Sequence, residues 1–108
     1  RKGDEFVTIT KVGTGVSDEL WKDIRTELNK LKVNQKPKEY ADVEKIFLPD
    51  VWVHPKLVVE IAGDDLTKSR THGAGVAVRF PRLVRIRRDK SPHDVTSVAE
   101  IRHMYKDQ

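Results

Sequence analysis

Apolar and basic residues alternate along residues 76–88, VAVRFPRLVRIRR, and this alternation predicts the clearest β-strand of the chain. Because Pro81 cannot donate a ladder hydrogen bond, we expect a bulge or an edge position there. One parity is apolar and is expected to face the core: Val76, Val78, Phe80, Val84 and Ile86. The other parity carries three arginines and two apolar residues: Arg79, Arg85, Arg87, Ala77 and Leu83.

A helical period governs residues 17–32, SDELWKDIRTELNKLK. Ser17 is the expected N-cap, and acidic residues follow it where the helix dipole favours anions. The opposite face is charged, so the helix is expected to lie flat on the rest of the domain. The apolar stripe of this helix consists of Leu20, Ile24, Leu28 and Leu31. Trp21 widens the stripe, so Trp21 is expected in the core.

Two further stretches are rich in Val, Ile, Thr and Phe and predict strands. Residues 5–15, EFVTITKVGTG, are expected to form a strand that ends at glycines, with Val7 and Ile9 on one face. Residues 45–65, KIFLPDVWVHPKLVVEIAGDD, predict a strand, a turn and a second strand. Residues 66–75, LTKSRTHGAG, predict a loop or an irregular strand that a glycine hairpin turn closes.

A helix is expected at the end of the chain. Ser97 and Glu100 have the S-x-x-E spacing of a capping box, directly before Val98, Ile101 and Tyr105 at helical spacing. Short strands separated by turns favour a mainly β fold with short helices. They indicate a small antiparallel sheet or a partly open barrel, and they argue against a βαβ layout.

The composition fits one small domain. The chain has 108 residues, of which 37% are hydrophobic and 35% are charged, which is enough apolar surface for a small core. It has no cysteine, which excludes disulfides and thiolate zinc sites and favours a reducing compartment. No apolar run predicts a membrane-spanning helix, and no signal peptide is present. Since the chain lacks an initiator Met, we expect it to begin inside a longer protein.

The positive charge is concentrated. Lys and Arg total 21 against 17 acids, a net charge of +4, and the segment Arg79–Lys90 alone contributes +5. A solvated edge and a phosphate-binding surface are the two interpretations. The segment is almost purely arginine and carries a single acid, Asp89, which argues against a salt-bridged surface. Guanidinium grips phosphate oxygens with two parallel hydrogen bonds, so a phosphate-bearing partner is favoured.

Four segments occur in order from about Phe6 to Tyr105: FVTITKVGTGVSDELW, VWVHPKLVVEIAGDDLTKS, GVAVRFPRLVRIRRDKSP and VTSVAEIRHMY. In this order they resemble the C-terminal OB-fold domain of ATP-dependent DNA ligases of the archaeal and eukaryotic replicative type. The first resembles the family's K-x-G-T-G-F-S-D-E-x-L segment and the second its W-x-x-P…V-x-E-[VI] segment. The third resembles its last signature motif, and the fourth its closing helix.

The resemblance implies that residues 1–108 form a small antiparallel OB-fold barrel with a C-terminal helix. It also implies a hinge to an adenylation domain that is not in this chain. In one orientation the last motif faces the ATP site and orients the pyrophosphate leaving group. In another orientation the domain lies on nicked duplex DNA. ATP and Mg²⁺ are the implied cofactors, bound mainly by the adenylation domain.

The family's R-x-D-K core corresponds here to Arg87, Asp89 and Lys90, which the resemblance assigns to the adenylation step. Arg87 and Lys90 are suited to stabilise charge on the departing pyrophosphate. Asp89 is expected to orient one of them or to act at the hinge. The expected DNA contacts are Arg79, Arg82, Arg85, Lys11 and Lys68.

Three departures from the family pattern are visible. Val16 stands where the family usually has Phe, which is a packing change. No K-x-D-G string, which carries the family's nucleophilic lysine, occurs in the chain, so this chain alone is expected to be inactive. The family's first OB strand is expected to be absent or reduced to RKGDE, which leaves one sheet edge unpaired.

The remaining candidate residues favour structural roles. GTG at residues 13–15 predicts a tight strand-to-helix turn, and the histidines lack metal-ligand spacing. Asp64 and Asp65 are expected in a turn, and Glu60 in a salt bridge to a neighbouring strand arginine. Trp52 is expected either to pack in the core or to stack on a base.

Three functions stay open on the sequence. The first is the OB domain of a ligase, the second a free-standing nucleic-acid-binding OB module, and the third a protein-binding surface on the arginine strand. The first implies nicked duplex DNA and the upstream adenylation domain as partners. A sliding clamp on the helix that begins at Ser17 is a further candidate, and no membrane partner is expected. The expected location is intracellular, either cytoplasmic with the nucleoid or nuclear.

Overall fold

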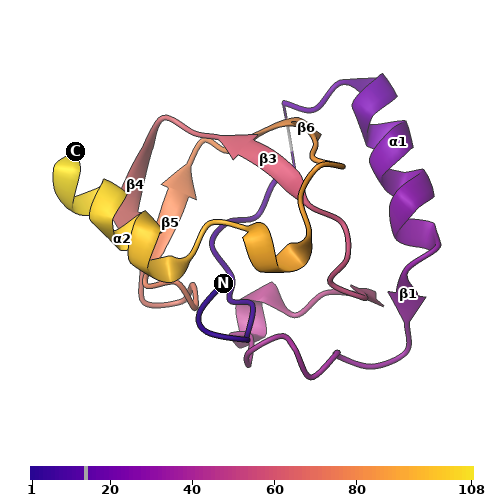
Figure 1. The fold of residues 1–108 in the computed structure, drawn as a ribbon, viewed down its shortest axis with the longest axis horizontal. Coiled ribbons are helices and arrows are strands. Elements are labelled where there is room, and N and C mark those ends of the chain that lie inside the picture. Colours follow the sequence, from indigo (N-terminus) through magenta and orange to yellow (C-terminus); the bar gives the residue numbers. More distant parts are fainter. Residues whose placement is uncertain (14) are drawn as a thin grey trace.

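Antiparallel strand pairs and short helices build the protein, as a computed structural model of residues 1–13 and 15–108 describes it (Figure 1). Helix α1 (Asp18–Asn29) and helix α2 (Val98–Asp107) lie at opposite ends of the molecule, with the strands between them. This arrangement confirms the predicted mainly β class with short helices and a C-terminal helix. It is consistent with an OB-like fold.

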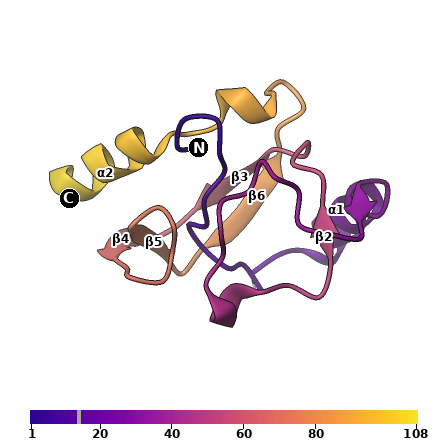
Figure 2. The same ribbon diagram turned by 90° about the horizontal axis from the view of Figure 1, so that it is seen from below.

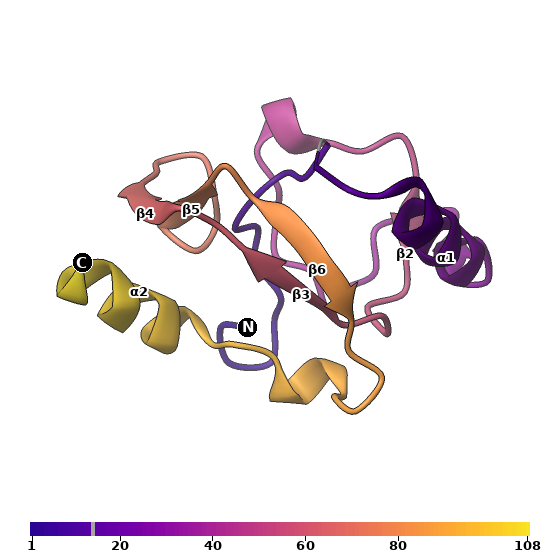
Figure 3. The ribbon, with the colours of Figure 1, turned by 90° about the horizontal axis from the view of Figure 1, so that it is seen from above.

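The strands pair in three two-stranded antiparallel sheets (Figures 2 and 3). In the described part of the chain these ladders do not join into a closed barrel. The three pairs are β1 (Lys32–Val33) with β2 (Trp52–Val53), β3 (Val59–Ala62) with β6 (Arg82–Ile86), and β4 (Asp65–Lys68) with β5 (Val76–Arg79).

The N-terminal segment runs beside β5 without forming a ladder. The oxygen of Thr8 accepts from the amide of Ala74 (3.0 Å), and the oxygen of Ile9 accepts from Val78 (3.3 Å). The prediction of a regular strand over residues 5–15 is therefore wrong, because these hydrogen bonds are spaced irregularly and do not form the alternating pattern of a β-ladder. Its inward face is confirmed, since Val7 and Ile9 pack against the core. Thr14 of the GTG motif lies outside the described residues.

Helix α1 begins as predicted, because the Ser17 hydroxyl oxygen accepts from the amide of Leu20 at 3.2 Å. Ile24 is the buried residue of the apolar stripe. The prediction that Trp21 lies in the core is wrong, since 40% of its surface is exposed. It borders an open groove that lies between α1 and Val51 of the segment before β2.

The core lies where β5 meets α2. Val76, Ala74 and Val98 are buried in one cluster, against which Ile101 and Tyr105 pack. The Ser97 hydroxyl accepts from the Glu100 amide (3.1 Å), and the Glu100 carboxylate accepts from the Ser97 amide (3.0 Å). The predicted capping box, and the helix that it starts, are confirmed.

The arginine-rich strand is broken in two. Phe80, between β5 and β6, has a φ of 49°, a left-handed conformation that is rare for an aromatic residue. The expected bulge or edge position at Pro81 is instead a break, which places the two halves in different sheets. The predicted inward position of Phe80 is wrong, because 62% of the residue is exposed.

A bulge in β6 changes the face of a second predicted core residue. Arg85 pairs with Glu60 and Leu83 pairs with Ile61, so Val84 has no partner in the β3–β6 ladder. The alternation therefore slips by one residue at Val84, which is exposed, while Leu83 is partly buried. The predicted positions of Val84 and Leu83 are thus reversed.

Residues 45–65 contain the two expected strands, but the first of them starts later than expected. Residues Lys45–Phe47 form a short 3₁₀ helix, η1, and the strands are β2 and β3. The predicted glycine turn is confirmed, because the β4–β5 hairpin closes at Gly75, whose φ is 81°. No helix among the described residues has the length and apolar character needed to cross a membrane.

Candidate functional site: the arginine edge

Five arginines follow one another along β5, β6 and the turn after β6, and we call this set the arginine edge. Each of them has a carboxylate partner, and most of these acids come from other elements. The pairs are Arg79–Asp65, Arg82–Asp64, Arg85–Glu60, Arg87–Glu60, Arg87–Asp89 and Arg88–Glu27. The expectation that a single acid excludes a salt-bridged surface is therefore wrong, because β3, β4 and α1 supply the missing acids.

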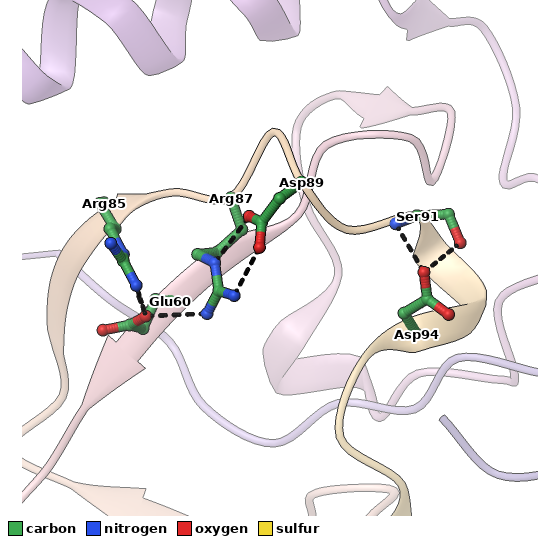
Figure 4. A network of polar contacts seen from close by, with 6 residues as sticks. All are labelled: Glu60, Arg85, Arg87, Asp89, Ser91 and Asp94. Atoms are coloured by element: carbon green, nitrogen blue, oxygen red, sulfur yellow. Dashed lines mark hydrogen bonds and ion pairs between the residues drawn. The ribbon is translucent and has the colours of Figure 1, made fainter.

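Arg87 makes the most extensive contacts of this edge (Figure 4). Its Nε and Nη2 donate to the two oxygens of Asp89 at 2.9 and 2.8 Å, and its Nη1 donates to Glu60 Oε1 at 3.0 Å. The hydrogen bond to Asp89 is the main cause that raises the pKa of Arg87, and it holds the pKa of Asp89 far below its usual range. Both side chains are therefore charged at neutral pH.

Glu60 is shared by two arginines. It faces Arg85 across the β3–β6 ladder, and its Oε1 accepts from Arg85 Nε at 3.1 Å as well as from Arg87. The amide of Arg87 donates to the oxygen of Val58 at 2.8 Å, which continues the strand pairing past β6. The predicted salt bridge of Glu60 is confirmed, and it brings the two guanidinium groups together.

Arg79 and Arg82 flank the break at Phe80. They pair with Asp65 at 3.3 Å and Asp64 at 3.0 Å, from the start of β4 and the turn before it. Half-exposed pairs of this kind contribute on the order of 0.2–1 kcal/mol, so a competing anion can displace them. The guanidinium carbon of Arg79 lies 5.0 Å from the centre of the Phe80 ring.

Phe80 is the residue at this edge that the sequence pattern misplaced. Its ring is exposed, and arginines lie on both sides of it. The signal that identifies it is the following Pro81, which ends the strand alternation at that point. An exposed aromatic ring with a guanidinium group close by is suited to contact the apolar part of a nucleic acid.

The three predicted lysines occupy different places. Lys90 follows the turn of Asp89 and is exposed, and its charge helps to lower the pKa of Asp94. The larger cause of that shift is the hydrogen bonding of Asp94 to Ser91. Lys68 lies at the end of the β4–β5 hairpin away from Arg79. Lys11 lines a separate cavity of about 350 Å³. Lys11 follows Thr10, whose hydroxyl donates to the oxygen of Val78 at 3.3 Å, next to Arg79, whereas Lys68 lies at the other end of that hairpin.

The arginine edge is suited to bind anions, and the other candidate residues of the sequence have structural contacts. In residues 1–13 and 15–108, no group of three or more His, Asp or Glu side chains converges to hold a metal ion. The histidine nearest the β5 strand, His72, instead donates to or accepts from Ser69 at 2.7 Å and packs on Phe47. Trp52, which the sequence left between core and base stacking, stacks on Tyr40 with ring centres 5.9 Å apart.

Comparison with known proteins gives a consistent result. Residues 1–90 match the family described as "ATP dependent DNA ligase C terminal region". The chain is 42% identical over 97% of its length to the "Probable DNA ligase" of Dictyoglomus turgidum, covering 19% of that protein. It is also 42% identical over 97% of its length to the "DNA ligase" of Aeropyrum pernix, covering 18% of it. The chain therefore spans about a fifth of the length of the curated relatives it matches.

Proposed function

The chain belongs to the C-terminal family of ATP-dependent DNA ligases, and from this premise we propose that it is the OB domain of such a ligase. In this proposal residues 1–108 follow an adenylation domain, bind nicked duplex DNA, and supply the last signature motif during enzyme adenylation. The relatives' names support the ligase activity, and the arginine edge supports the contacts with phosphate.

The observation that carries the proposal is the placement of Arg87. Two carboxylates from different elements hold its guanidinium group at the surface, with Arg85 beside it and Lys90 three residues further on. An arginine that is oriented before its ligand arrives loses less conformational freedom on binding. A phosphate group accepts two parallel hydrogen bonds from such a guanidinium fork.

In the adenylation step, Arg87 and Lys90 bind and orient the pyrophosphate that leaves ATP. Charge develops on the leaving oxygens as the phosphorus bond breaks, and fixed cations stabilise this charge without further rearrangement. Asp89 carries a negative charge, so it does not stabilise the leaving group; it holds Arg87 before the phosphates bind. The nucleophilic lysine belongs to the adenylation domain.

In the DNA-bound state, the first half of the arginine edge contacts the duplex. Arg79 and Arg82 flank the exposed Phe80, so two phosphate-binding groups and one apolar group project from the break between β5 and β6. Arg85 extends the same edge along β6. Lys11 and Lys68 are further contacts to the DNA backbone in this proposal.

ATP and Mg²⁺ are the cofactors of the proposed reaction. Mg²⁺ would neutralise charge on the phosphates, but no acidic cluster of the described residues fits it, and no step is assigned to it on this chain. The phosphates of ATP do fit this chain, because Arg87 and Lys90 are cations whose N–H donors suit phosphate oxygens. The adenylation domain then holds the metal and the nucleoside.

Adenylation of the gene product that contains this chain tests the proposal. Incubation with ATP labelled in its α-phosphate should give a protein with covalently attached AMP, and nicked duplex should then be sealed. Binding of the nicked duplex should weaken steeply with salt, in proportion to the phosphates contacted. A gene product that takes up no label supports the free-standing OB module instead. Binding that does not change with salt would argue against the DNA contacts.

A further inference from the structure

We propose that Glu60 is a positioning residue of the anion site, and that Asp89 occupies the place of the incoming phosphate on Arg87 until the phosphate displaces it. The proposal rests on the proposed function, since it concerns the same arginine. It divides the two carboxylates that hold Arg87 into one that stays and one that leaves.

Asp89 occupies one of the two guanidinium edges of Arg87 that can bind a phosphate through two hydrogen bonds. Arg87 has two outward edges with a pair of N–H donors, and Asp89 takes both donors of the Nε–Nη2 edge. A carboxylate and a phosphate accept the same fork of two parallel hydrogen bonds. Asp89 therefore competes with any phosphate that approaches this edge.

The two carboxylates differ in how firmly they are held. Glu60 lies within β3, pairs through its backbone with Arg85, and accepts from both Arg85 and Arg87 through a single oxygen. Asp89 lies in the turn after β6, and its side chain is 65% exposed, compared with 36% for Glu60. Asp89 can therefore turn toward solvent with little disturbance, whereas release of Glu60 frees two guanidinium groups.

The charges of the cluster balance in this arrangement. Arg85 and Arg87 carry two positive charges, and Glu60 and Asp89 carry two negative charges. The paired cluster therefore attracts a phosphate weakly from a distance. When Asp89 moves away, one positive charge remains uncompensated next to Lys90, and Glu60 still fixes the direction of both arginines. Phosphate binding and departure of Asp89 are thus coupled.

Titration of this chain with inorganic pyrophosphate tests the division of roles. The Arg Nε–H signals in NMR spectra report the binding, and the wild type is compared with Asp89→Asn, Glu60→Gln and Asp64→Asn. Each variant removes the negative charge of one acid that forms a salt bridge with an arginine of the arginine edge. Asp64→Asn is the matched control, because Asp64 contacts Arg82 and lies outside the Arg87 cluster.

Asp89→Asn should bind pyrophosphate roughly three- to tenfold more tightly than the wild type, with the largest shift at the Arg87 Nε–H signal. Asp64→Asn should bind like the wild type. Glu60→Gln should gain nothing or bind more weakly, although a pure charge effect would make it bind more tightly. An equal gain for all three variants, an equal gain for Glu60→Gln and Asp89→Asn, or no binding by any protein would overturn the proposal.

The adenylation assay separates this inference from the proposed function. If Asp89→Asn binds no more tightly than the wild type while Arg87→Ala still slows adenylation of the longer gene product, only the division of roles fails. If Arg87→Ala leaves adenylation unchanged, the proposed function itself fails, whatever the pyrophosphate titration gives.

Discussion

Arg87 and Asp89 are joined by two parallel hydrogen bonds, from Nε to Oδ1 at 2.9 Å and from Nη2 to Oδ2 at 2.8 Å. The residues are two positions apart, at the end of the arginine-rich segment, so the pair forms within a single turn of chain. It neutralises the arginine that we assign to the leaving pyrophosphate. The state of this pair therefore links the stability of the domain to its function.

The pair should make stability depend on acid pH. Its hydrogen bonds lower the pKa of Asp89 below the ordinary value of 3.8, so below about pH 4 the unfolded chain binds a proton that the folded chain does not. The stability from this pair is present above that pH and is lost as the pH falls toward the folded pKa. The difference in unfolding temperature between wild type and Asp89→Asn should therefore shrink from neutral pH to about pH 3. A difference that stays constant over this range would contradict the assignment.

Replacement of the N-cap of α2 should destabilise the domain. In Ser97→Ala the amide of Glu100 loses its side-chain acceptor and the capping box is broken, at a cost of about 1 kcal/mol. Chemical denaturation followed by far-ultraviolet circular dichroism measures the loss. Thr96→Ala is the matched control, because within the described part of the chain Thr96 forms a hydrogen bond through its backbone oxygen and not through its side chain. A loss of the same size in both variants would show that the cap is not its cause.

Gly63 should not tolerate a side chain. A Cβ atom there would lie 2.1 Å from Cγ1 of Val78 and 3.0 Å from the oxygen of Arg79. Gly63→Ala should lower the free energy of unfolding by roughly 1–3 kcal/mol, because β5 has to move away. Gly13→Ala is the control, since a Cβ atom there would meet no atom within 4 Å among the described residues beyond its chain neighbours. Equal stability of the two variants would be inconsistent with the packing of Gly63 against β5.

Phe80 should contribute to DNA binding but not to stability. Asn accepts a left-handed backbone more readily than Phe does, so Phe80→Asn preserves the conformation at φ 49° and removes the exposed ring. We expect an unchanged or slightly higher unfolding temperature, together with nicked-duplex binding weakened several-fold. Fluorescence anisotropy with labelled duplex measures the affinity. Undiminished binding by this variant would remove Phe80 from the proposed contact surface.

Local signals in the sequence predicted the parts of the fold that depend on a few neighbouring residues. The caps at Ser17 and Ser97 and the glycine hairpin turn formed as expected, because their hydrogen bonds join residues within a few positions. The alternation also predicted correctly that Val76 faces the core. These features need no knowledge of which distant strand lies alongside.

The features that sequence reasoning missed depend on pairing between distant segments. The bulge at Val84 arises from the register between β3 and β6. Its one extra residue places Leu83 and Val84 each on the face opposite to the one that the alternation predicts. The acids that pair with the arginine edge lie up to sixty-one positions away, as for Arg88 and Glu27. Trp21 has the spacing of a core residue, but whether it is covered depends on where the β1–β2 pair lies.

The central claim is that Arg87 acts in the adenylation step, and comparison of two steps in one variant tests it most directly. In the longer gene product, Arg87→Ala should slow self-adenylation from ATP by at least about a hundredfold, because a positioned cation at the leaving group is lost. Sealing of nicks that already carry AMP should fall far less, since no pyrophosphate leaves in that step. Lys90→Ala should show the same order of effects. Equal losses in both steps would contradict the role assigned to Arg87.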